Sequence, residues 1–112
     1  MKITTPLPQD KKLTLVLRLE PGCLGPDGEK NIAPFCDFAQ KEFASIDAHF
    51  AHWEIVPRQD KSLPEVEYKI NNRHLARDKA TKYLAAFNRS LDEFEEQLHN
   101  KIALLINQFL GH

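Results

Sequence analysis

Residues 21–28 read Pro-Gly-Cys-Leu-Gly-Pro-Asp-Gly and contain three of the chain's four glycines. They stand between an alternating apolar stretch and a segment of helical periodicity, where backbone amides can be directed at an anion. We therefore expect a candidate site for a small anionic ligand in the segment 21–32. The five residues that would form it are Gly22, Cys23, Gly25, Gly28 and Asn31. The spacing matches neither a dinucleotide fingerprint nor a phosphate-binding loop, and Pro-Gly and Pro-Asp-Gly are also ordinary turn sequences. Both interpretations, a ligand site and a plain turn, stay open.

Cys23 lies near the expected start of a helix, which would lower the pKa of its thiol and favour the reactive thiolate. A nucleophile also needs a base within hydrogen-bond reach, and His49 and His52 are the candidates by position. Together with Cys36, these three residues could be considered as the four ligands of a zinc ion. The two cysteines are thirteen residues apart, however, whereas structural zinc sites pair cysteines about two to four residues apart. We therefore predict no metal, no cofactor and no catalytic residue, with enzymatic use of Cys23 as a minor alternative.

Basic residues gather between positions 69 and 89, where the single acid is Asp78. The residues that define this basic patch are Arg73, Arg77, Lys79 and Lys82. Side chains one helical turn apart could hold phosphates, so nucleic-acid binding is a third hypothesis. The formal net charge of −1 argues against it. Acidic residues follow at positions 92–96, and the two groups would pair if the helices fold back on each other.

The C-terminal segment is more apolar than one buried helix face requires. Ile102 to Ile106, followed by Phe109-Leu110, is apolar nearly all round. The apolar side chains outside the buried face must pack against the preceding helix, a second copy of the chain or another protein. We expect an intermolecular contact in a homodimer. Its interface residues would be Ile102, Leu104, Leu105, Ile106, Phe109 and Leu110.

Alternation and helical spacing define the elements that must position these groups. We expect strands over residues 13–19, 50–56 and 66–70, and helices over 32–46, 73–88 and 91–110. Asn31 as N-cap would place Pro34 in the first turn of the first helix. A capping box of Ser90 and Glu93 predicts a break or a kink near residues 88–90, so that the last two segments are either separate helices or one kinked helix. Gly111 is expected to end the last segment. The second and third strands are expected to pair antiparallel.

The order β-α-β-β-α-α predicts an α+β fold. We expect a two-layer sandwich in which helices cover one face of a small mixed three-stranded sheet. Residues 1–12 would form a flexible N-terminal arm and 13–112 a single domain. A hydrophobic fraction of 42%, no apolar run long enough for a membrane span and no visible signal peptide indicate a soluble cytoplasmic protein. The favoured function is a non-catalytic interaction or regulatory module that self-associates through its C-terminal helix.

Overall fold

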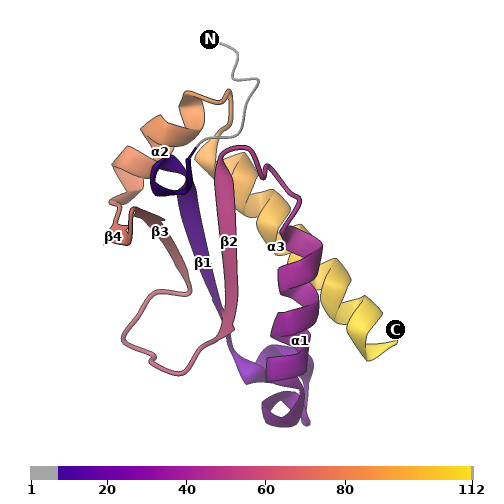
Figure 1. Cartoon of the computed structure of the whole chain (residues 1–112). Coiled ribbons are helices and arrows are strands. Elements are labelled where there is room, and N and C mark those ends of the chain that lie inside the picture. The colour runs from indigo at the N-terminus through magenta and orange to yellow at the C-terminus, as the bar shows by residue number, and fades with distance from the viewer. Residues whose placement is uncertain (1–7, 112) are drawn as a thin grey trace.

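The computed structural model describes residues 8–111 of the chain. Within this range the chain forms three α-helices, two short 3-10 helices (η) and one sheet of four strands (Figure 1). In chain order the elements are η1 (Gln9–Lys11), β1 (Leu13–Leu19), η2 (Pro21–Leu24), α1 (Gly28–Phe43), β2 (Ala51–Pro57), β3 (Val66–Ile70), β4 (Arg73–His74), α2 (Arg77–Ala85) and α3 (Leu91–Leu110). The α+β class predicted from the sequence is confirmed, with four strands in the described sheet rather than three.

β1 is the central strand of the sheet. It pairs in parallel with β2 and antiparallel with β3, and the strand order is β2-β1-β3-β4. Leu15 therefore lies between Trp53 of β2 and Tyr68 of β3. The prediction that β2 and β3 pair with each other is wrong. The crossover through α1 places β2 on one side of β1 in the sheet. Residues 58–65 then lead the chain to β3, which pairs on the other side of β1.

A short hairpin replaces the start of the predicted second helix. Asn71 and Asn72 have φ values of +50° and +64°. Two consecutive residues with positive φ are what a two-residue type I′ turn requires, and asparagine tolerates this region better than most residues. The chain therefore reverses into β4 and pairs with β3. The helix predicted from residue 73 begins instead at Arg77.

The first helix begins four residues earlier than predicted. Asp27, not Asn31, occupies the N-cap position of α1. Pro34 consequently lies in the second turn, where its missing N–H removes one helical hydrogen bond. Its side chain is exposed, so the ring meets solvent rather than the core.

The predicted boundaries of the last helix are confirmed. Ser90 occupies the N-cap position of α3, and its hydroxyl accepts a hydrogen bond from the Glu93 amide at 3.5 Å. Gly111 ends the helix with a φ of +78°, the left-handed conformation that glycine adopts without strain. Asn88 also has a positive φ, and it lies in the turn that separates α2 from α3. The two helices are therefore separate elements rather than one kinked helix.

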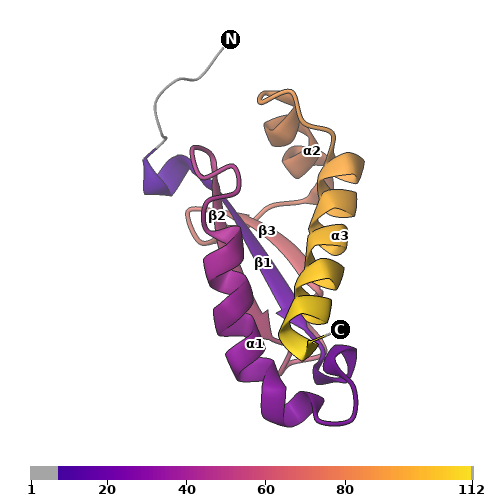
Figure 2. The same cartoon turned by 90° about the vertical axis from the view of Figure 1, so that its right-hand side faces the viewer.

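α1 and α3 lie side by side over one face of the sheet (Figure 2). The core lies between this face and the two helices. β1 contributes its four alternate leucines, none more than 5% exposed. The four residues are Leu13, Leu15, Leu17 and Leu19. Burying a side chain of this kind stabilises the fold by about 1.5–3 kcal/mol.

α2 packs near the end of the sheet where β1 begins. Its Tyr83 hydroxyl donates a hydrogen bond to the carbonyl oxygen of Lys11 at 2.9 Å. Within the predicted N-terminal arm, residues 1–7 lie outside the described residues, whereas residues 9–11 form η1. The hydrogen bond from Tyr83 thus ties η1 to α2.

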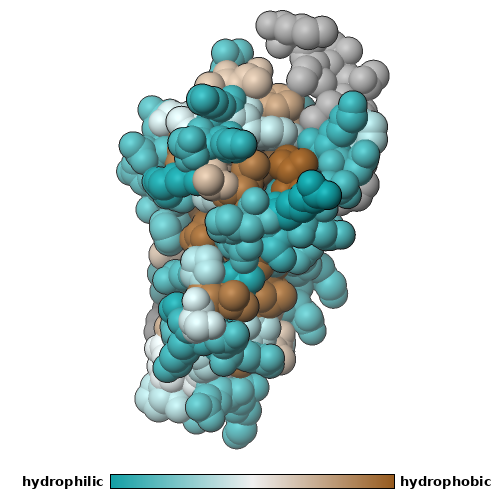
Figure 3. Space-filling view, turned by 90° about the vertical axis from the view of Figure 1, so that its left-hand side faces the viewer, coloured by the Kyte–Doolittle hydropathy of each residue, from teal (hydrophilic) through white to brown (hydrophobic). Residues whose placement is uncertain are grey.

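The opposite face of the sheet is largely polar, with apolar side chains visible between polar ones (Figure 3). Arg18 of β1 and Glu67 of β3 are both buried there and form an ion pair of 2.7 Å. Arg18 also donates to the carbonyl oxygen of Pro64 at 2.8 Å, and His74 Nδ1 lies 3.1 Å from Glu67. Burial opposes ionisation of Glu67, but the hydrogen bonds from Arg18 and His74 hold its pKa below the ordinary value. This buried charge is therefore compensated.

A side chain of α1 covers the free edge of β2. Gln40 Nε2 donates a hydrogen bond to the carbonyl oxygen of Trp53 at 2.7 Å, and its Oε1 accepts one from the amide of Ile55 at 2.8 Å. The glutamine amide thus imitates a neighbouring strand. Natural sheets commonly protect their edges in ways that prevent pairing with another chain.

Candidate functional site

Residues 21–28, which we call the glycine turn, join β1 to α1 through η2. The fold itself accounts for two of the glycines in this turn. Gly25 has a φ of +87°, which other residues rarely adopt. A Cβ on Gly28 would lie 1.7 Å from the carbonyl oxygen of Pro21, so only glycine fits there. Gly22, by contrast, faces open space. The spacing of these residues therefore follows largely from the geometry of the turn.

Three backbone amides at the start of α1 already have partners. The amide of Gly28 donates to the carbonyl oxygen of Gly25 at 3.0 Å. The amides of Lys30 and Asn31 both donate to the carbonyl oxygen of Asp27 at 3.1 Å. An anion site at a helix N-terminus needs amides that are free to meet the ligand. These three amides are used within the turn.

A cavity of about 730 Å³ lies beside the turn. The charged residues that line it are Lys30, Arg58 and Lys61 on the basic side and Glu20, Asp27 and Glu29 on the acidic side. Arg58 is further neutralised by Glu20, to which it donates at 3.1 Å. Its Nη2 donates to the carbonyl oxygens of Lys61 and Leu63 at 3.3 and 3.1 Å. The balance of charge gives this cavity no net attraction for an anion.

Cys23 is exposed on the turn, yet its thiol is not activated. Partial burial of the sulfur raises its pKa, and the nearby carboxylates of Glu65 and Glu20 raise it further. The expected lowering of this pKa is therefore wrong, and the thiol is protonated at neutral pH. His49 and His52 stand at the start of β2, beside the start of β1, whereas Cys23 follows the end of β1. A seven-residue strand, about 20 Å, separates the thiol from either base.

Cys36 lies in the core at 4% exposure, and burial raises the pKa of its thiol to about 11. It is thus an inert apolar residue of α1. Among residues 8–111, no three His, Cys, Asp or Glu side chains come together in a way that could hold a metal ion. Cys23 and the two histidines of the considered zinc set lie at opposite ends of β1.

The apolar end of α3 is met mainly by α1. Ile102 and Leu105 are buried in the core, and Ile106 and Phe109 pack partly against it. The ring of Phe109 contacts that of Phe35 edge-on, with 5.3 Å between centroids. Leu104 differs, because it is 51% exposed. Most apolar side chains at the end of α3 are therefore buried within one chain, and only a small apolar surface around Leu104 faces solvent.

The two candidate sites named from the sequence are neighbours in space. A groove of about 520 Å³ runs between the glycine turn and the end of α3. Cys23 and Pro26 line it from the turn, and Ile106, Asn107 and Leu110 line it from the helix. This contact could not be predicted from the sequence, because about 80 residues separate the turn from the end of α3.

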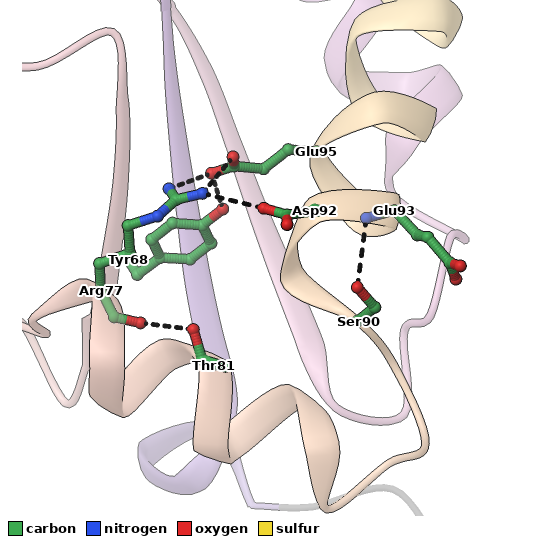
Figure 4. Close-up of polar contacts among 7 residues, drawn as sticks. All are labelled: Tyr68, Arg77, Thr81, Ser90, Asp92, Glu93 and Glu95. Carbon is green, nitrogen blue, oxygen red and sulfur yellow. Dashed lines mark hydrogen bonds and ion pairs between the residues drawn. The ribbon is translucent and has the colours of Figure 1, made fainter.

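The basic patch is partly neutralised by the acidic start of α3. Arg77 donates to both carboxylate oxygens of Glu95 at 3.0 Å and reaches Asp92 at 3.4 Å (Figure 4). The pairing of the two charged groups is thus confirmed for this arginine. Tyr68 of β3 joins the same cluster by donating its hydroxyl to Glu95. Tyr68 was not a candidate from the sequence, because its contact with Glu95 depends on how the sheet and α3 pack.

The other members of the basic patch, Arg73, Lys79 and Lys82, are exposed. Across the described residues none of them forms an ion pair. Arg73 lies on β4 and the two lysines on α2, so the patch does not follow a single helix. A continuous phosphate-binding helix face is therefore not present in this part of the chain.

Comparison with known proteins finds no matching family model, no matching curated protein and no matching solved structure. None of the helices formed by residues 8–111 combines the length and the apolar character that crossing a bilayer requires. Any functional proposal for the chain therefore depends on the geometry described above.

Proposed function

We propose that this chain is a non-catalytic interaction module that forms a homodimer through the outward surface of the C-terminal half of α3. The observation that carries the proposal is the absence of charged residues after Lys101 in α3. Residues 102–111 contain no charged side chain, although 28% of the chain is charged, whereas residues 92–96 contain four acids. Depletion of charge distinguishes the centre of protein interfaces from the rest of a surface.

The outward residues of this half form a stripe on one side of the helix. Ala103, Leu104 and Asn107 are exposed and Leu110 is half-buried, at the spacing of one helix face. We call these four residues the outward stripe. In a twofold arrangement the same stripe meets itself, so that two α3 helices pack against each other. The small side chain of Ala103 would let the two helices approach closely, and Leu104 of one protomer would reach the groove beside its partner's glycine turn.

Light scattering coupled to size exclusion tests this proposal. The wild-type chain is expected at twice its mass of 12.9 kDa, and Leu104→Glu is expected at 12.9 kDa. Leu63→Glu is the matched control, because Leu63 is similarly exposed at 41% but lies in the loop between β2 and β3. A wild-type chain that stays at 12.9 kDa at every concentration reached would contradict the proposal.

The other two functions considered from the sequence have weaker support. An anion site at the glycine turn is favoured by the cavity there but opposed by paired amides and balanced charges. Nucleic-acid binding would have to use Arg73, Lys79 and Lys82 alone, because Arg77 is held by α3. The two free cysteines of the described chain are consistent with the cytoplasmic location that we propose for the module.

A further inference from the structure

A small cavity opens between α1 and α3, and none of the residues that line it belongs to the outward stripe. At one end of the helix pair, Phe109 of α3 packs against Phe35 and Phe38 of α1, with ring centroids 5.3 and 5.9 Å apart. Toward the other end, the helices leave a cavity of about 200 Å³ over Trp53 of β2. An apolar cavity of about 150 Å³ is large enough to bind benzene. The space between the helices thus accepts one aromatic ring.

The walls of this cavity are aromatic and aliphatic. The Trp53 ring stacks on Phe94 of α3, with 5.7 Å between centroids and 11° between planes. Phe43 of α1 lies on the cavity wall with its ring 4.8 Å from that of Trp53. The indole N–H of Trp53 is already used, since it donates to the carbonyl oxygen of Ile46 at 2.9 Å. What these residues offer an occupant is therefore carbon surface, which favours an aromatic or aliphatic group.

The rim of the cavity carries one positive charge that no acid neutralises. Lys101 of α3 lines the cavity and is half-buried, and the ion pairs of residues 8–111 include none to its amine. The acid on the rim, Asp47, is paired with Arg89 at 2.5 Å. Gln97, also on the rim, can donate from its side-chain amide. These groups favour an occupant with an anionic end.

We propose that the cavity binds a small aromatic carboxylate. Its ring occupies the space over Trp53, between the walls formed by Phe43 and Phe94. Its carboxylate meets the amine of Lys101 at the rim, with the amide of Gln97 as a second donor. None of the residues that line the cavity belongs to the outward stripe, so the proposal does not rest on dimerisation.

The single tryptophan of the chain makes the test specific. Benzoate is titrated into the ¹⁵N-labelled full chain, and the indole N–H resonance of Trp53 is followed by NMR. We expect a saturable shift with benzoate and binding about fivefold weaker with benzyl alcohol, which has a similar ring but no charge. Lys101→Gln is expected to bring benzoate to the affinity of benzyl alcohol. Lys41→Gln, an exposed lysine of α1 outside the cavity, is expected to change neither.

A second variant tests the position of the site without altering the core. Gln97→Phe places a ring over the mouth and is expected to abolish the shift, whereas Gln108→Phe, exposed on the same helix but outside the cavity, retains it. The dispersion of each variant's amide spectrum shows that it is folded. The proposal is overturned if benzoate gives no saturable shift in the wild-type chain. It is equally overturned if both ligands bind alike and Lys101→Gln changes neither.

Discussion

Arg77 at the start of α2 makes two hydrogen bonds of 3.0 Å to the carboxylate of Glu95 on α3. The Tyr68 hydroxyl donates to the same carboxylate at 2.5 Å. Burial works against the charged form of Glu95, but the hydrogen bonds from Arg77 and Tyr68 outweigh it and lower its pKa. Burial and the bond to Glu95 raise the pKa of Tyr68, so the phenol stays protonated and acts as a donor. The cluster thus ties β3, α2 and α3 together.

Glu95→Gln should weaken the fold at neutral pH and reduce its sensitivity to acid. Because the pKa of Glu95 is lowered on folding, its contribution is complete above the unfolded value of about 4.3 and is lost as the pH falls through the folded value. We expect the unfolding free energy at pH 7 to fall by about 1–2 kcal/mol. Urea denaturation from pH 7 to pH 3 measures both effects. Glu96→Gln, at the exposed neighbouring position, serves as control, and an unchanged pH slope in Glu95→Gln would count against the cluster.

The glycine turn offers a matched pair of substitutions. Gly28→Ala forces a methyl group into the carbonyl oxygen of Pro21, 1.7 Å from the ideal Cβ position, so the turn has to move. We expect a loss of more than about 2 kcal/mol in unfolding free energy. Gly22→Ala meets nothing within 4 Å and should stay within about 0.5 kcal/mol of the wild type. Thermal and urea unfolding distinguish the two. Equal effects would show that close packing of η2 against α1 is not what requires glycine at position 28.

Features set by neighbouring residues could be predicted from the sequence. The side chain of Ser90 caps α3, and Gly111 ends it in the left-handed conformation, because caps are local interactions. The alternating leucines of β1 indicated a strand for the same reason. The turn at Asn71-Asn72 carried a readable signal as well, since paired asparagines suit a hairpin with two positive φ values.

Features that depend on distant contacts could not be predicted. The alternation of β2 and β3 identifies both as strands but does not say that β1 lies between them. The pKa of Cys23 is raised rather than lowered, because the direction of its shift depends on partial burial and on Glu65, which comes from another segment. The cavity over Trp53 likewise exists only once α1 and α3 are placed on the sheet. Local spacing carries no information about such distances.

The contact of Gln40 with the edge of β2 leads to the last prediction. Gln40→Met keeps the length of the side chain but removes both hydrogen bonds, leaving the Trp53 carbonyl and the Ile55 amide without them. Unsatisfied backbone groups of this kind cost about 1–3 kcal/mol. We expect lower stability in urea, faster hydrogen exchange at the Ile55 amide and more aggregation on heating, since the bare edge can pair with another chain.

Lys41→Met is the matched control for this edge, because Lys41 is the exposed neighbour of Gln40 on α1 and adds the same side chain without touching β2. It separates the effect of an added apolar group from that of an uncovered strand. Aggregation in both variants would implicate the methionine itself. Faster exchange at Ile55 in Gln40→Met alone would identify the glutamine as the group that closes the sheet, and unchanged exchange there would refute that role.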